Sequence, residues 1–340
     1  MRTALQATVA CLGLLTALTA PQLAAQSHWD VTNTLHLGGD GSWDYITIDP
    51  ATHRLFVTRT THTIVIDENS GKVLGDIPGQ TRSHGVAIVP RLNRGFITDG
   101  GGTGAIIVFD LKTYAVLGKI ATIPDSDGII YDAKQDRVLA VSGDGNALMV
   151  IKPDMDPNGK IDPPIQLGGA PEFLAADGSG RVFVNLEDKD MVAVVDLKTN
   201  KVVQRWPVAP GGHPVGMSID AAQHLIFIGC RNPQKLVAIN TETGKVEASL
   251  PIGAGVDATA AFNGQAFAST GDGALTVVGK SDGAWAVEET VKTPAGARTM
   301  TVDPSSRKIF LPTAELEPAA AGARPRPKPG TFMIVVVEPK

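Results

Sequence analysis

The chain alternates short hydrophobic runs with turns rich in Gly, Asp and Asn, and one such run recurs seven times. Its copies span 54–60, 94–100, 137–143, 181–187, 225–231, 265–271 and 308–314. Short apolar runs rich in β-branched and aromatic residues and bounded by turn residues predict β-strands. A unit that repeats about every 42 residues is typical of propeller blades, so the seven copies predict an all-β, seven-bladed β-propeller.

A second pattern places a polar turn between two further strands of the repeat. It occurs as IDENSGKVLG (66–75), FDLKTYAVLG (109–118), VDLKTNKVVQ (195–204) and INTETGKVEA (239–248). Asp, Asn and Gly at these positions predict tight hairpin turns. No stretch with helical periodicity separates the strands after the N-terminal segment, which excludes an alternating α/β fold.

The two ends of the chain are predicted to share one blade. The last repeat has strands near ARTMTVD, KIFLP and TFMIVVV and then stops at Lys340, while an orphan strand at 31–38 precedes the first repeat. We expect 31–38 to complete the seventh blade, because ring closure removes an open sheet edge. Residues 26–340 then form a single domain, with a Pro-rich loop insertion at 314–330 that replaces a tight turn on the funnel face. We consider both a lid or docking arm and an idle loop for this insertion.

The N-terminus has the features of a secretory signal peptide. Arg2 precedes an apolar run from Ala4 to Ala20, and PQLAAQ supplies a small-residue cleavage site near Ala25. We therefore expect residues 1–25 to be cleaved, the mature protein to be periplasmic or extracellular, and no membrane contact after cleavage. Cys230 is then the single cysteine and cannot form an intramolecular disulfide; we expect a buried small hydrophobe rather than a reactive thiol.

Composition and charge limit the classes of binding partner that we expect. The net charge is −5 and the acidic and basic residues are interspersed, which argues against broad contact with a nucleic-acid backbone. The basic, Pro-rich stretch at 323–330 is expected to be a solvated loop. No phosphate-binding loop, haem-attachment or nucleophile-elbow motif is present. We expect a monomer that binds a small molecule or a protein partner, no nucleic acid, and no organic cofactor.

The strings LFVTRT, VFVNLE and TETGKV, at this period, resemble the YVTN (YncE-like) propeller repeat family over about residues 31–340. The resemblance implies a periplasmic or extracellular propeller. It implies no particular activity, because propellers carry many unrelated functions.

The start of each innermost strand is the expected ligand site, since propeller ligands usually sit in the funnel at one end of the central channel. Registering the repeats on the first-strand Asp (Asp49, Asp132, Asp177, Asp220, Asp303) puts seven residues at one equivalent position. They are Asp44, His84, Asp127, Glu172, Val215, Asp257 and Arg298. Six of these seven are ionisable, whereas the position two residues later is mostly apolar, so the ionisable groups are predicted to converge at the channel mouth.

A ring of carboxylates favours a hard cation, Ca²⁺ or Mg²⁺, bound by Glu172, Asp257, Asp44 and Asp127, together with Asn185 from the end of a second strand. The set Glu172, Asn185 and Asp257 resembles, by residue type, the metal ligands of six-bladed lactonases of the gluconolactonase type. His84, Glu172 and Arg298 are the candidates for catalysis. A water-filled channel with a structural Arg–Asp ion pair is the alternative.

Two functions therefore stay open from sequence. One is a binding or scaffolding propeller that captures a small ligand, metal or partner at the funnel. The other is a divalent-metal-dependent hydrolase or lyase, lactonase-like, that uses the funnel carboxylates.

A separate motif, DMDPNGKID (154–162), places Asp154, Asp156, Asn158 and Asp162 at positions 1, 3, 5 and 9 of an EF-hand-like loop. Position 12 is Ile165 in place of the bidentate Glu. The motif therefore predicts either a weak structural Ca²⁺ loop or an ordinary hairpin turn on the face opposite the funnel.

Overall fold

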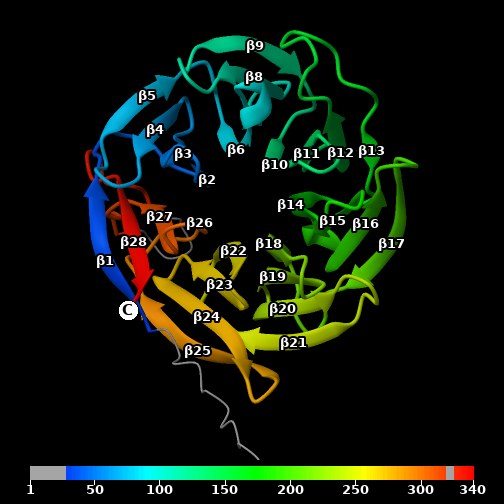
Figure 1. The fold of residues 1–340 in the computed structure, drawn as a ribbon, viewed down its shortest axis with the longest axis vertical. Coiled ribbons are helices and arrows are strands. Elements are labelled where there is room, and N and C mark those ends of the chain that lie inside the picture. Colours follow the sequence, from blue (N-terminus) through cyan, green and yellow to red (C-terminus); the bar gives the residue numbers. More distant parts are fainter. Residues whose placement is uncertain (1–27, 319–324) are drawn as a thin grey trace, which may run out of the picture.

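The computed structural model describes residues 28–318 and 325–340. It contains seven four-stranded antiparallel sheets arranged in a ring around a central axis (Figure 1). The predicted all-β, seven-bladed propeller is confirmed. In the described residues, helical structure is limited to two 3₁₀ turns, η1 (Pro90–Leu92) and η2 (Glu187–Lys189), and no helix there could span a bilayer. The predicted signal peptide lies outside the described residues.

In blades 1 to 6 the strands run outward from the axis in chain order, and in blade 7 the N-terminal strand takes the outermost place, so equivalent strands can be grouped. The innermost strands are β2 (Ile46–Asp49), β6 (Ser83–Val89), β10 (Ser126–Asp132), β14 (Pro171–Ala176), β18 (Pro214–Asp220), β22 (Val256–Phe262) and β26 (Thr301–Asp303). The second strands are β3 (Arg54–Thr58), β7 (Arg94–Asp99), β11 (Arg137–Ser142), β15 (Arg181–Leu186), β19 (Leu225–Arg231), β23 (Gln265–Thr270) and β27 (Lys308–Thr313).

The two outer positions complete each sheet. The third strands are β4 (Thr63–Asp67), β8 (Ala105–Asp110), β12 (Ala147–Ile151), β16 (Met191–Asp196), β20 (Gln234–Asn240), β24 (Ala274–Ser281) and β28 (Met333–Pro339). The outermost strands are β5 (Val73–Ile77), β9 (Val116–Ala121), β13 (Ile165–Gln166), β17 (Lys201–Pro207), β21 (Val246–Pro251), β25 (Ala284–Lys292) and β1 (Trp29–His36).

The seventh blade is closed by the N-terminal strand, as the sequence predicts. Its sheet has the order β1-β28-β27-β26, and β1 pairs antiparallel with β28 from Trp29↔Pro339 to His36↔Met333. Trp29 is buried and packs edge-on against Phe267 of blade 6, with ring centroids 4.9 Å apart. The first strand therefore joins the last blade and also contacts the blade before it.

The hydrophobic core is divided among the seven interfaces between neighbouring blades, each with its own buried cluster. A large apolar residue at the third position of every second strand anchors these clusters. The residues are Phe56, Phe96, Leu139, Phe183, Phe227, Phe267 and Phe310, all at most 1% exposed. Neighbouring blades pack face to face around the ring, because each face of a blade presents alternate residues of its strands.

The hairpins between third and fourth strands form for a local reason. The Asp67 carboxylate accepts hydrogen bonds from the backbone N–H groups of Asn69 and Ser70, at 3.2 and 2.8 Å, and Gly71 has φ +69°. A side chain that caps its own turn, followed by a residue in the left-handed region, is a stable way to reverse an antiparallel pair. The predicted hairpin pattern is therefore present.

The insertion between β27 and β28 leaves the blade as a short two-stranded ladder. Leu316 pairs with Pro327, and the N–H of Lys328 donates to the carbonyl of Glu315 at 2.7 Å. The Nζ of Lys328 lies 2.9 Å from the Glu315 carboxylate. Part of the basic stretch predicted at 323–330 lies outside the described residues.

Candidate functional site

A local irregularity of the innermost strands positions the ionisable ring at the channel mouth. In blades 2 to 6 the pairing of the first strand with the second shifts next to the ring residue, for example between Ser83 and Val86 around His84. A β-bulge turns the side chain away from the regular pleat and often re-aims it. The ring position is therefore set by the same backbone feature in five blades.

Side chains of one blade also hold the ring backbone of the next. Thr58 donates to the His84 carbonyl at 2.8 Å, and Thr98 donates to the Asp127 carbonyl at 2.6 Å. Asn185 and Ser269, also on second strands, make equivalent bonds to the carbonyls of Val215 and Arg298, at 2.8 and 2.6 Å. In blade 7 the donor is Thr299, the residue after Arg298, which bonds to the Asp44 carbonyl at 2.9 Å. Asn185, which the sequence suggested as a metal ligand, lies fully buried in the wall between blades 4 and 5 and donates its amide there.

The first group within the ring consists of Asp44, His84 and Asp127. His84 Nδ1 lies 2.7 Å from Asp44 Oδ2 and 3.5 Å from Asp127 Oδ1. One donor atom from each of the three residues lies within 4.8 Å of the others. His84 is buried, and Asp127 Oδ1 is a buried oxygen without a hydrogen-bond partner. These three residues could together hold a metal ion.

The electrostatics of this side of the ring disfavour a full set of negative charges. Burial, together with Asp44 and Asp125, raises the pKa of Asp127 well above its usual range. Burial, with Asp127 and Glu187 nearby, raises the pKa of Glu172 to about 9. Burial and neighbouring negative charges both favour the protonated form of a carboxyl group, and a bound cation opposes them.

The opposite side of the ring is internally neutralised. Asp257 forms ion pairs with both Arg298 and Arg231. Burial raises the pKa of Asp257, and the two guanidinium groups counter this shift. Arg231 lies at the end of β19, the second strand of blade 5. The alternative of a structural ion pair therefore describes Asp257, whereas Asp44, Asp127 and Glu172 have no such arginine pair among the described residues.

An aromatic pair closes the channel directly beneath the ring. Tyr45 of blade 1 and Phe173 of blade 4 meet across the axis with ring centroids 4.8 Å apart. The equivalent residues of the other blades are small: Gly85, Gly128, Gly216, Ala258 and Thr299. A Cβ added at Gly85 would lie 2.8 Å from Ile129 Cγ2, so the inner strands approach too closely for larger residues there.

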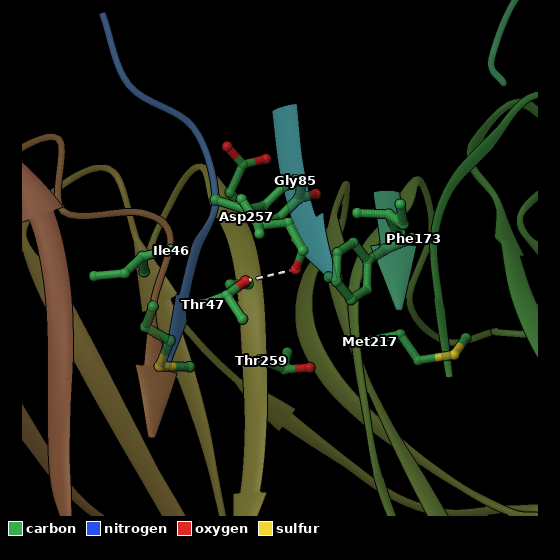
Figure 2. A pocket seen from close by; sticks show the side chains of 13 residues that line it. Ile46, Thr47, Gly85, Phe173, Met217, Asp257 and Thr259 are labelled. Atoms are coloured by element: carbon green, nitrogen blue, oxygen red, sulfur yellow. Dashed lines mark hydrogen bonds between the residues drawn. The ribbon is translucent and has the colours of Figure 1, made fainter. Parts of the chain in front are cut away.

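A cavity of about 60 Å³ lies beside this pair. Figure 2 shows Asp257 above Phe173, with Met217 and Thr259 further down the channel. Burial and four acidic neighbours raise the pKa of Tyr45 well above its usual range, so the phenol stays protonated. Ionisable side chains therefore line the mouth of the site, and aromatic and apolar side chains lie beneath them.

Sequence reasoning missed the Tyr45–Phe173 pair. The signal was available, because these are the two aromatic residues at a repeat position otherwise occupied by small ones.

The EF-hand-like motif lies between β12 and β13, against β9 of the neighbouring blade. The N–H of Asn158 donates to the Asp156 carboxylate at 2.9 Å, and Asn158 Oδ1 accepts from the N–H of Lys119 at 3.2 Å. Within residues 28–318 and 325–340, the clusters of three potential metal donors are Asp44/His84/Asp127 and His53/Glu68/Asp303. Asp154, Asp156 and Asp162 do not form a third.

The comparisons with known proteins bear on the fold. No model of a known protein family matches the chain, and no curated protein matches it. Among solved structures, the chain is similar to a chain of hydrazine synthase from Kuenenia stuttgartiensis, with a TM-score of 0.70 and 14% sequence identity. The match covers 81% of this chain and 94% of that one. At this identity the likeness concerns the propeller fold alone, a scaffold suited to binding ligands or partners.

Proposed function

We propose that the protein is a binding propeller whose funnel captures a divalent cation between Asp44, His84 and Asp127. The observation that carries the proposal is Asp127 Oδ1, a buried oxygen with no hydrogen-bond partner among the described residues, 3.5 Å from His84 Nδ1. Buried polar atoms are almost always satisfied, and a cation held by this oxygen and the two neighbouring donor atoms would satisfy it.

The charge distribution supports a cation over an anion. Arg298 and Arg231 already neutralise Asp257, while Asp44, Asp127 and Glu172 share the remaining space with one imidazole. A cation bound beside Asp127 would favour the ionised form of this carboxyl group and offset the cost of burying it. Because the donor set includes a histidine nitrogen, Mn²⁺ fits it better than the Ca²⁺ or Mg²⁺ expected from carboxylates alone.

The test is calorimetric titration of Mn²⁺ into the metal-stripped protein. We expect one ion per funnel, with affinity at least tenfold weaker in Asp127→Asn and Asp44→Asn. Asp125→Asn is the matched control, because Asp125 is a nearby rim carboxylate that pairs with Arg82 at 2.8 Å. Mn²⁺ affinity that is equal in wild type and Asp127→Asn would overturn the proposal.

A second candidate function is a divalent-metal-dependent hydrolase or lyase acting on a lactone or sugar-like substrate. The observation that favours it is Glu172, whose pKa of about 9 keeps a protonated carboxylic acid at the funnel at neutral pH. Such a group can serve as a general acid. In this case Glu172→Gln would retain Mn²⁺ binding and lose turnover of lactones; the absence of turnover by the Mn²⁺-loaded wild type across a lactone panel would rule the enzyme out.

Kinship with the YVTN repeat family and export through residues 1–25 are part of the same proposal. The seven-fold repeat and the funnel site are compatible with an exported binding protein. Intact mass of the chain expressed with its own N-terminus, recovered from the bacterial periplasm, tests export. Cleavage near Ala25 is expected, whereas full-length protein confined to the cytoplasm would contradict it.

A further inference from the structure

Glu68 occupies a position that holds leucine in other blades. Its backbone N–H donates to the carbonyl of His53 at 3.0 Å, just as Leu111 donates to Asn93 at 3.0 Å and Leu197 to Gly180 at 2.9 Å. The Glu68 side chain is 1% exposed, and Leu111 is likewise buried. A buried carboxyl group in a leucine position is costly unless its charge is compensated.

The neighbours of Glu68 compensate only one of its two oxygens. Oε1 lies 2.8 Å from Nδ1 of His53, whereas Oε2 is buried and finds no hydrogen-bond partner in the part of the chain that the structure describes. Asp303, fully buried at the end of β26, places a carboxylate oxygen within 4.8 Å of donor atoms of both His53 and Glu68. Lys308, the nearby amine on β27, pairs with Glu338 at 3.5 Å and lies 3.4 Å from Asn69 Oδ1.

We propose that His53, Glu68 and Asp303 form a second divalent-cation site, separate from the funnel, that fastens blade 7 to blade 1. His53 lies in the turn between β2 and β3, Glu68 follows β4, and Asp303 ends β26, so the site bridges the first and last blades of the ring. It lies on the face opposite the funnel, where the innermost strands end. The cation adds a direct link between blades 7 and 1 to the ring closure that the β1–β28 pairing provides.

The donor set selects the class of ion. One imidazole nitrogen and two carboxylate oxygens, the same donor types as at the funnel, suit a first-row divalent ion. Zn²⁺ is the probe here, because such ligands bind it more tightly than Mn²⁺ and three of them leave a fourth position for water. The His53 side chain is 52% exposed, which gives the ion a route in from solvent.

The repeat supplies the test variant. Glu68→Leu installs the residue that blades 2 and 4 carry at this position, so the fold accommodates it; Glu68→Gln keeps the shape and the hydrogen bond to His53 while removing the charge. Both are made in the Asp127→Asn background, in the mature full-length protein, so that zinc at the funnel does not contribute.

We expect Asp127→Asn to bind one Zn²⁺ per chain by elemental analysis and to melt several degrees higher with Zn²⁺ present, because a ligand at 100 times its Kd stabilises by about 2.7 kcal/mol. Both effects disappear in the two Glu68 double variants. Asp127→Asn protein that binds no zinc, or double variants that retain the zinc and the melting shift, would overturn the proposal. The Asp127→Asn substitution is common to all three proteins, so the difference between them reports the site at His53, Glu68 and Asp303 alone.

Discussion

At the scale of single residues, the acidic side chains of the funnel differ in how far their charge is compensated. Asp257 is compensated by two arginines, whereas Glu172 is buried among acidic groups, and burial is the main reason that its pKa rises to about 9. The difference arises from neighbours contributed by separate blades. It has a measurable consequence for the dependence of stability on pH.

Glu172 is expected to make the protein less stable as the pH rises. In the folded state it keeps its proton up to about pH 9, whereas in the unfolded chain it ionises near 4.5. Between these values the unfolded state binds fewer protons, so the free energy of unfolding falls with increasing pH. Urea unfolding of metal-free protein at pH 5 and pH 9 should show Glu172→Gln losing at least about 1 kcal/mol less than wild type. Parallel losses in the two proteins would contradict the assignment.

Cys230 is expected to be chemically inert in the folded protein. Its thiol is fully buried between blades 4 and 5, and burial raises its pKa to about 12. The thiolate is the reactive form, so a soluble disulfide reagent should label little native protein and all of the protein in guanidinium. Rapid stoichiometric labelling without denaturant would refute this burial.

The sequence predicted which residues occupy the ring and did not predict how they pair. Asp44, His84 and Asp127 could be aligned because the repeat fixes their positions along the innermost strands. The contacts within the ring depend on rotamers and on residues from other strands, such as Arg231, which pairs with Asp257. Neither property is periodic, so repeat alignment does not contain it.

At the scale of elements, hydrogen bonds between blades both stabilise the packing of neighbouring blades and position the backbone of the candidate site. Thr98 Oγ1 accepts from the N–H of Gly85 at 2.9 Å and donates to the carbonyl of Asp127 at 2.6 Å. Blade 3 has Val141 at the equivalent position, so the repeat tolerates an isosteric apolar side chain there. Removing the hydroxyl in blade 2 would leave two buried backbone groups without this partner.

Thr98→Val is expected to lower the free energy of unfolding by about 1–3 kcal/mol and to weaken cation binding at the funnel, because the Asp127 backbone loses its restraint. Urea unfolding and Mn²⁺ titration measure the two effects. Thr32→Val, on the exposed part of β1, is the control and should change neither. A Thr98 variant as stable as wild type would argue against this role.

The strands themselves followed from sequence because each blade is built from hairpins between neighbouring segments. Local alternation and turn residues suffice to define such elements. The bulges at the ring residues were not predicted, although Gly85, Gly128 and Gly216 directly follow ring positions and glycine inside a strand often marks a bulge. These bulges orient the candidate site.

At the scale of the whole molecule, stability depends on closing the ring with β1. Trp29→Ala is expected to cost about 3–5 kcal/mol, because it removes a buried indole that packs against Phe267 of the adjoining blade. His36→Ala, at the exposed end of the same strand, should cost little. Equal losses in the two variants by urea unfolding would mean that this contact does not hold the closure.

A cation held at the funnel between blades 1, 2 and 3 would be visible by anomalous diffraction from crystals soaked in Mn²⁺. We expect an anomalous peak within coordination distance of Asp44, His84 Nδ1 and Asp127, and no such peak in crystals of Asp127→Asn. Soaked wild-type crystals with no anomalous peak at these three residues would contradict this expectation.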